Sequence, residues 1–184
     1  DDHVTGVVLE YDTEQAHPET LSFERRAGTP QDEVGIGLVG GGTFAEGTIL
    51  PALADLPVSF VGVATASGTS ARHVAEEFDF GYATTDYTEV LDDDDVDLVV
   101  VATRNNLHAE IAVEALQRDR HVHVEKPLAL DRAELRGVVD ALDESQGQLH
   151  VGYNRRFAPQ SAEIRRALAD RSTPVMAHYR VSVD

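Results

Sequence analysis

The sequence of 184 residues contains no cysteine, no tryptophan, one methionine and a single lysine, Lys126. Without cysteine the chain can form neither a disulfide scaffold nor a cysteine-ligated zinc site. It has no apolar run of the roughly 18–20 residues that a membrane span needs, and no signal-peptide pattern opens it. Cations are scarce, and phosphates repel an acidic chain. We therefore expect a cytoplasmic globular protein with neither a membrane nor a nucleic-acid partner.

Acidic residues are abundant: 33 Asp and Glu stand against 15 Lys and Arg, which gives a net charge of −18. Apart from Lys126, every cation is an arginine. This composition is typical of a halophilic protein, because concentrated salt screens self-repulsion and carboxylates hold water and cations. An ordinary acidic cytosolic protein can have the same composition, so both interpretations stay open. We favour the halophilic one because of the bias against lysine.

Residues 1–33 differ in composition from the rest of the chain. Val4–Tyr11 predicts a short strand rich in β-branched residues. Residues 12–33 are polar, contain prolines and lack periodicity, as linkers do. The first residue is Asp rather than an initiator Met, so the chain is either processed or cut from a longer protein. We favour a fragment of a longer protein, with residues 1–33 as the tail of an upstream domain.

From Val34 onwards short apolar runs alternate with helical patterns, and such runs suit strands buried on both faces of a parallel sheet. The expected strands are Val34–Val39, Val58–Ala64, Val96–Ala102, His121–Val124 and Gln148–Tyr153. The expected helices are Thr43–Leu56, which Pro51 ends or kinks, Ser70–Phe78 after a Thr69 cap, His108–Arg118, and Arg132–Ser145 after a capping box of Asp131 and Glu134. This alternation predicts an α/β fold with a doubly wound parallel sheet over residues 34–153.

After Tyr153 the pattern changes. Ser161–Leu168 predicts a helix, and Val175–Val183 alternates as a half-exposed strand does. One helix and one strand cannot bury a core of their own. We therefore interpret residues 154–184 as the beginning of a second α/β domain that is mostly absent.

A glycine-rich turn follows the first of these strands. Gly40, Gly42 and Ala45 have the spacing G-x-G-x-x-A between an expected strand and an expected helix. Gly40 permits a tight turn, Gly42 lets a pyrophosphate approach the backbone, and Ala45 allows close packing. The helix start at Thr43 and Phe44 offers N–H groups and a positive dipole to phosphate. Such a turn can be merely a tight loop, but its position favours dinucleotide binding.

The end of the second expected strand selects the cofactor, because an acidic side chain there would bind the ribose 2′-hydroxyl of NAD. This chain places Thr65 and Ser67 there, with Arg72 close behind. Hydroxyls and an arginine suit a 2′-phosphate better than a bare diol. The alternative is that these are only turn and cap residues. We expect NADP or NAD as the cofactor and favour NADP.

Polar residues also follow the third expected strand. Thr103, Asn105 and His108 lie at its carboxyl end, where ligands bind in sheets of this kind. They could equally serve as caps for the helix that begins at His108. Both interpretations stay open from the residues alone.

Lys126 follows the fourth expected strand directly. A lysine at that edge can donate a hydrogen bond or a proton to a substrate hydroxyl or carbonyl oxygen. The alternative is an ordinary ion pair with Glu125, although neighbours on a strand point to opposite faces. His121, His123 and Glu125 share one face, but strand histidines are more often packed or hydrogen-bonded than metal-bound. We therefore predict no metal site.

Four segments carry a family resemblance when they are read in order: Gly40-x-Gly42-x-x-Ala45, Ala102–Glu110, Glu125-Lys126-Pro127 and Val151–Phe157. Together they resemble the Gfo/Idh/MocA oxidoreductases over residues 34–184. The resemblance implies an NAD(P)-binding Rossmann domain followed by an α/β domain with an open antiparallel sheet. It also implies hydride transfer between NAD(P) and a sugar, cyclitol or related hydroxy compound, and a homo-oligomer when the protein is full length.

The resemblance also implies roles for single residues. Lys126 would lie at the nicotinamide and the substrate and assist catalysis. Glu125, Asn105 and His108 would line the nicotinamide-ribose end, and Arg156 would lie near the cofactor.

The sequence departs from the family in several places. Arg104 stands where the family usually has proline, and Thr65 stands where it usually has an acidic residue. The second-domain Asp and His that complete the family's catalytic group are expected beyond Asp184. Gly6–Tyr11 and the linker resemble the junction in two-part proteins of this family. A non-catalytic NAD(P)-binding sensor is the alternative function, although the retained Lys126 argues against it.

Overall fold

The computed structural model describes residues 20–23, 33–178 and 180. The strands of this part are β1 Thr20–Ser22, β2 Val34–Val39, β3 Val58–Ala64, β4 Tyr82–Thr84, β5 Leu98–Val101, β6 His121–Glu125 and β7 Leu149–Gly152. The helices are α1 Leu50–Ala54, α2 Gly68–Phe78, α3 Tyr87–Asp92, α4 His108–Leu116, α5 Arg132–Glu144 and α6 Pro159–Leu168. A π-helical segment, η1 Ala45–Ile49, precedes α1, and 3-10 turns form η2 Asn105–Leu107 and η3 Asn154–Phe157.

The seven strands form one sheet in the order β1-β4-β3-β2-β5-β6-β7. The pairs β2–β3, β3–β4, β2–β5 and β5–β6 are parallel, and β1 adds to β4 as an antiparallel edge strand. The chain builds outward from β2 to β4 and then returns to the other side of β2 with β5. This reversal of strand order beside β2 is the switch point of a doubly wound sheet, at whose carboxyl edge ligands bind. The predicted fold class is confirmed.

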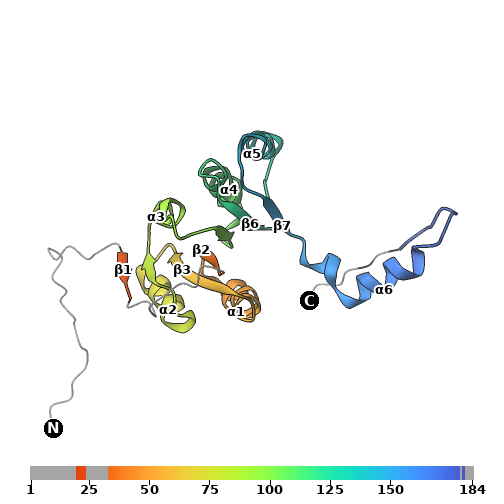
Figure 1. Cartoon of the computed structure of the whole chain (residues 1–184). Helices are drawn as coiled ribbons and strands as arrows, with labels where there is room; N and C mark the ends of the chain where they lie inside the picture. Colours follow the sequence, from red (N-terminus) through yellow and green to blue (C-terminus); the bar gives the residue numbers. More distant parts are fainter. Residues whose placement is uncertain (1–19, 24–32, 179, 181–184) are drawn as a thin grey trace, which may run out of the picture. The chain divides into compact units, whose positions relative to one another are not determined.

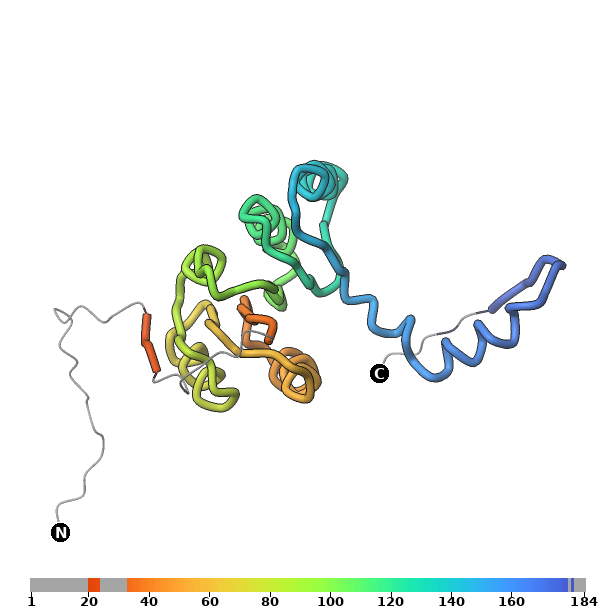
Figure 2. Tube along the Cα trace, in the orientation of Figure 1, coloured from red at the N-terminus to blue at the C-terminus, as the bar shows by residue number. Residues whose placement is uncertain are grey.

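Helices cover both faces of the sheet. Figure 1 shows α1 and α2 on one face and α3, α4 and α5 on the other. Figure 2 follows the chain from β5 through α4 to β6 and then through α5 to β7. Two buried clusters match this arrangement. One joins the sheet to η1, α1 and α2, and the other joins it to α3, α4 and α5. The strand residues between them are buried on both faces, as their apolar sequences predict.

Most elements of the domain agree with the sequence patterns. β2 and β3 have the predicted bounds, and α5 begins after Asp131, whose carboxylate accepts from the N–H groups of Ala133 and Glu134. The third strand begins at Leu98 rather than Val96, because the Val96 N–H closes a turn onto the Asp93 carbonyl.

Other elements differ from the prediction. The α2 cap is Ser67, whose Oγ accepts from Ser70 N at 3.2 Å, so the Thr69 cap is wrong. β4 and α3 were not predicted, since a three-residue strand and a six-residue helix are too short to show a period. β1 lies within the segment interpreted as a linker. Pro51 lies directly after the π-helical segment, and the helix continues past it to Ala54, so Pro51 does not end the helix.

By its internal contacts the chain divides into two units, residues 1–151 and 152–184. The second unit contains η3 and α6, neither of which has a buried residue. α6 begins two residues before the predicted helix. The predicted strand Val175–Val183 is absent over Val175–His178, and most of its remainder lies outside the described residues. The predicted strand Val4–Tyr11 also lies outside them. None of the described helices is long and apolar enough to cross a membrane.

Candidate functional site

The glycine turn after β2 depends on a close approach between two backbones. Gly40 has φ 101°, a backbone conformation that residues with a side chain rarely adopt. A Cβ there would lie 2.5 Å from the Ala102 carbonyl oxygen and 2.8 Å from the Thr103 nitrogen. The Gly40 N–H in turn donates to the Ala64 carbonyl at 2.8 Å. Gly40 therefore lets the chain turn against the ends of β3 and β5 at once.

Gly42 differs from its neighbours in having open space around it. A Cβ on Gly42 would meet no atom within 4 Å, whereas one on Gly41 would lie 2.9 Å from Val74 Cγ2 of α2. Thr43 and Phe44 are exposed beside it, and Ala45 is buried in the core. Gly41 is a residue that the sequence analysis missed, because its constraint comes from α2. The backbone of Gly42 is accessible to a ligand, as close approach of a pyrophosphate requires.

The residues after β3 form a compact turn. Thr65 Oγ1 donates to the Ser67 carbonyl at 2.7 Å, and Ser67 Oγ caps α2. Arg72 forms an exposed ion pair with Glu76 at 2.7 Å, one turn along α2. The structure thus brings Thr65 and Ser67 together at the sheet edge and directs the Arg72 guanidinium to its neighbour on the helix.

The residues after β5 surround a buried histidine. His108 is 1% exposed, with Nδ1 at 2.8 Å from the Pro127 carbonyl oxygen and Nε2 at 3.1 Å from the Thr103 carbonyl oxygen. Asn105 is exposed at the start of η2, and Thr103 is half-buried. His108 therefore contacts the loop after β6 as well as its own loop.

Glu125 and Lys126 differ sharply in exposure. Glu125 is buried, and its Oε1 lies 3.7 Å from Nε2 of His123. Lys126 is exposed at the carboxyl edge of the sheet. Its ammonium is therefore accessible to a small molecule at this edge.

A histidine pair on β6 and β7 lies next to Glu125. Nδ1 of His123 is 2.9 Å from Nδ1 of His150, and the two rings stack with their centroids 5.0 Å apart. Burial lowers the pKa of His123, His150 lowers it further, and Glu125 opposes both effects. The ring of His121 instead accepts from the Gln148 N–H at 3.1 Å. His123 therefore lies between His150 and Glu125, whereas His121 has a separate backbone partner.

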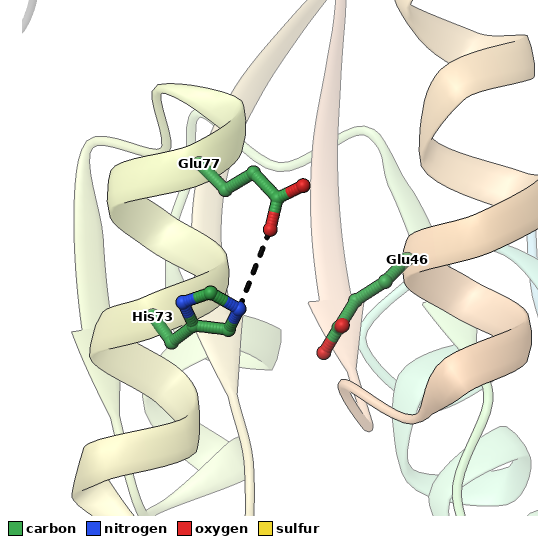
Figure 3. A group of neighbouring side chains, drawn as sticks. All are labelled: Glu46, His73 and Glu77. Atoms are coloured by element: carbon green, nitrogen blue, oxygen red, sulfur yellow. Dashed lines mark ion pairs between the residues drawn. The ribbon is translucent and has the colours of Figure 1, made fainter.

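One group of three side chains in the described part of the chain could approach a metal ion: Glu46, His73 and Glu77. Figure 3 shows His73 and Glu77 together on α2, with Glu46 on the neighbouring helical segment. Their ligand atoms lie within 4.8 Å of one another, whereas atoms that bind one ion at about 2.0–2.2 Å lie only about 3–3.5 Å apart. His73 and Glu77 already form an exposed i,i+4 ion pair at 3.4 Å. We interpret this group as a surface ion pair with a nearby carboxylate.

Arg156 belongs to the second unit. Its guanidinium lies over the Phe157 ring at 5.4 Å, and its carbonyl accepts from Arg165 Nη2 at 2.8 Å. Both contacts of Arg156 are with residues of the same unit. Its predicted role near the cofactor stays a prediction.

The register of the sheet brings the remaining residues to one edge. Val39 pairs with Ala64 on one side and Val101 on the other, and Val101 pairs with Val124. The residues that follow these four strands therefore lie side by side. They supply an open glycine turn, hydroxyl groups and one ammonium group, which are suited to a nucleotide and a polar substrate.

Comparisons with known proteins agree with this arrangement. The family model of oxidoreductases with an NAD-binding Rossmann fold, Gfo/Idh/MocA, matches residues 34–153. The chain belongs to this family. Levoglucosan dehydrogenase of Pseudarthrobacter phenanthrenivorans is 34% identical over 69% of the chain, and inositol 2-dehydrogenase of Rhizobium meliloti is 28% identical over 74%. The chain spans about 35% and 41% of the lengths of these relatives.

Solved structures show the same likeness. A 3-ketoreductase from Actinomadura kijaniata in complex with NADP has a TM-score of 0.70 and 27% identity, over 76% of this chain and 44% of that one. Levoglucosan dehydrogenase in complex with NADH and levoglucosan has a TM-score of 0.69 and 29% identity, over 76% of this chain and 40% of that one.

Proposed function

We propose that this chain is the cofactor-binding part of an NAD(P)-dependent oxidoreductase that transfers a hydride to or from a sugar, cyclitol or related hydroxy or keto compound. The observation that carries the proposal is the shared sheet edge, where the open Gly42 backbone follows β2 and the exposed Lys126 follows β6, two parallel strands that flank β5. The names of the relatives, levoglucosan dehydrogenase and inositol 2-dehydrogenase, support a sugar-like substrate.

Different residues at this sheet edge would bind the cofactor and move the proton. Bound NAD(P) would supply the hydride donor or acceptor. The open backbone at Gly42 would accept the pyrophosphate, and the buried Ala45 would hold the following helix against the sheet. Nζ of Lys126 would hold the proton of the substrate hydroxyl, or donate to the carbonyl oxygen in the reverse direction.

The test of this function is Lys126→Met in the full-length protein. Methionine keeps the unbranched side chain and removes the ammonium group. We expect turnover to fall at least about 100-fold, because a positioned acid–base group contributes about 10²–10⁴-fold. The affinity for reduced cofactor, measured by fluorescence titration, should change less than about threefold, since the glycine turn is intact.

Arg132→Met is the matched control, because it removes one exposed cation at the start of α5. We expect it to retain turnover. Unchanged turnover in Lys126→Met would remove the lysine from the mechanism. Cofactor binding by the wild type with no turnover on any sugar-like substrate would favour the sensor function instead.

The chain's wider organisation is part of the same proposal. We place the nucleotide-binding domain at residues 34–153, the beginning of the substrate domain at 154–184, and the tail of an upstream domain at 1–33, of which Thr20–Ser22 adds an edge strand to the sheet of the nucleotide-binding domain. We further propose that the full-length protein is cytoplasmic, as its composition led us to expect, and that it is a homo-oligomer, as the family resemblance implies. Light scattering of the full-length protein measures the oligomeric state directly.

A further inference from the structure

His108 is an unusual residue to find in the interior of this domain. Only three buried side chains in the described part of the chain are polar or charged: Thr84, His108 and Glu125. His108 begins α4, and its ring reaches the backbones that follow β5 and β6. It is thus a direct contact between two of the loops that form the candidate site.

Both ring nitrogens of His108 face backbone carbonyl oxygens. Nδ1 is 2.8 Å from the Pro127 oxygen, and Nε2 is 3.1 Å from the Thr103 oxygen. A carbonyl oxygen only accepts, so each contact is a hydrogen bond only when the facing nitrogen bears a proton. A neutral ring donates to one of them, and a doubly protonated ring donates to both. With both nitrogens occupied by the protein, the ring has no nitrogen directed at a ligand.

The contact with Pro127 is the one that concerns Lys126. Pro127 follows Lys126 directly and has no N–H of its own, so its carbonyl is the backbone polar group with which this residue can be held. We propose that His108 is a positioning residue, whose Nδ1–H bond to Pro127 fixes Lys126 for the substrate. This inference rests on the proposed function, and it gives His108 a different role from the ribose contact that the family resemblance implies.

Two substitutions separate the two contacts. The amide nitrogen of asparagine can take the place of Nδ1, and that of glutamine can take the place of Nε2. His108→Gln therefore keeps a donor for Thr103 and loses the one for Pro127, whereas His108→Asn does the reverse. We expect His108→Gln to lower kcat about 100-fold, as small misplacements of a reacting group do. The kcat of His108→Asn should be about tenfold higher than that of His108→Gln.

Other measurements distinguish positioning from mere stability. Each variant has one amide donor for the two carbonyl oxygens and leaves the other oxygen without a donor, so the two variants should have similar Tm values, and their Kd for reduced cofactor should stay within about threefold of the wild type. Equal losses of kcat in the two variants would show a structural role and overturn the proposal.

A spectroscopic test does not depend on the variants or on activity. Nitrogen-15 shifts of the His108 ring in the full-length wild type should show a proton on Nδ1. A ring protonated only at Nε2 would overturn the proposal even if both variants fail to fold. If Lys126→Met keeps full turnover, the proposed function fails, whatever the state of His108. If Lys126→Met is inactive but His108→Gln is not, only the positioning role fails.

Discussion

At the scale of single residues, cofactor choice depends on which groups at the end of β3 are still available to a ligand. Thr65 and Ser67 form hydrogen bonds with each other and with the start of α2. Thr65 is half-buried and Ser67 is exposed, so a ligand can still reach both. Arg72, the predicted cation for a 2′-phosphate, is paired with Glu76. An exposed i,i+4 pair contributes only about 0.3–0.5 kcal/mol, so a phosphate could compete for the guanidinium. The absence of a carboxylate at Thr65 is therefore the stronger argument for NADP.

Thr65→Asp tests this argument. A carboxylate would accept from the ribose 2′-hydroxyl of NADH and repel the 2′-phosphate of NADPH. We expect the ratio of the two dissociation constants to shift towards NADH by tenfold or more, about 1.4 kcal/mol. Fluorescence titration with both reduced cofactors measures this ratio. Ala54→Asp adds the same charge at the exposed end of α1, before β3 begins, and should leave the ratio unchanged. Tighter binding of NADH by the wild type would contradict the preference for NADP.

Residues differ in how far their roles could be predicted from the sequence. Gly40 was predicted for a tight turn, and its positive φ agrees, because the pattern G-x-G-x-x-A describes local backbone geometry. Gly41 and His108 depend on partners far along the chain: Val74 of α2 and the Pro127 carbonyl. No local pattern encodes such a contact. His108 was therefore predicted by resemblance, and its two carbonyl partners were not.

At the scale of elements, the longer buried strands were easier to predict than the short strands β1 and β4. β2 and β3 are continuous apolar runs because helices cover both of their faces. β1 and β4 have three residues each and show no period. The carboxyl edge was predicted from the ends of the expected strands, since it needs neither the strand order nor the exact partners. The cross-strand pair of His123 and His150 needs the β6–β7 register and was missed.

This histidine pair predicts an acid sensitivity. The pKa of His123 is lowered below its ordinary value of 6.5, chiefly by burial and then by His150. The unfolded chain therefore takes up a proton first as the pH falls. The stability that neutral His123 contributes is complete above pH 6.5 and is lost as the pH falls through the folded-state pKa.

His150→Gln should reduce this loss, because it removes the ring that, after burial, lowers the pKa of His123. We expect the wild type to lose more Tm between pH 7.5 and 5.5 than His150→Gln does, as measured by calorimetry. His73→Gln is the control, because it removes an exposed histidine of α2 away from this pair, and it should lose about as much Tm as the wild type. The same pH dependence in His150→Gln and in the wild type would show that the pair does not couple to folding.

At the scale of the whole molecule, the fold depends on the buried apolar residues, whereas the net charge acts at the surface. The parallel sheet is held by apolar residues, and its α/β class could be predicted without reference to charge. The net charge of −18 acts on the surface and opposes compaction. Helix α5 shows how: its last turn contains Asp143 and Glu144 and no basic residue. Negative charge at a helix carboxyl end is unfavourable to the helix dipole, and the exposed Asp140 adds a like charge within one turn.

Salt should therefore stabilise this protein. At 1 M ionic strength the screening length is about 3 Å, so repulsion between exposed carboxylates almost vanishes. We expect Tm, measured by calorimetry, to rise with KCl towards molar concentrations. A variant with Asp140→Asn, Asp143→Asn and Glu144→Gln should be more stable than the wild type in low salt and gain less from KCl, because part of the repulsion is already gone. If Tm stayed flat or fell with KCl, the acidic surface would be an ordinary cytosolic one, and the halophilic interpretation would be wrong.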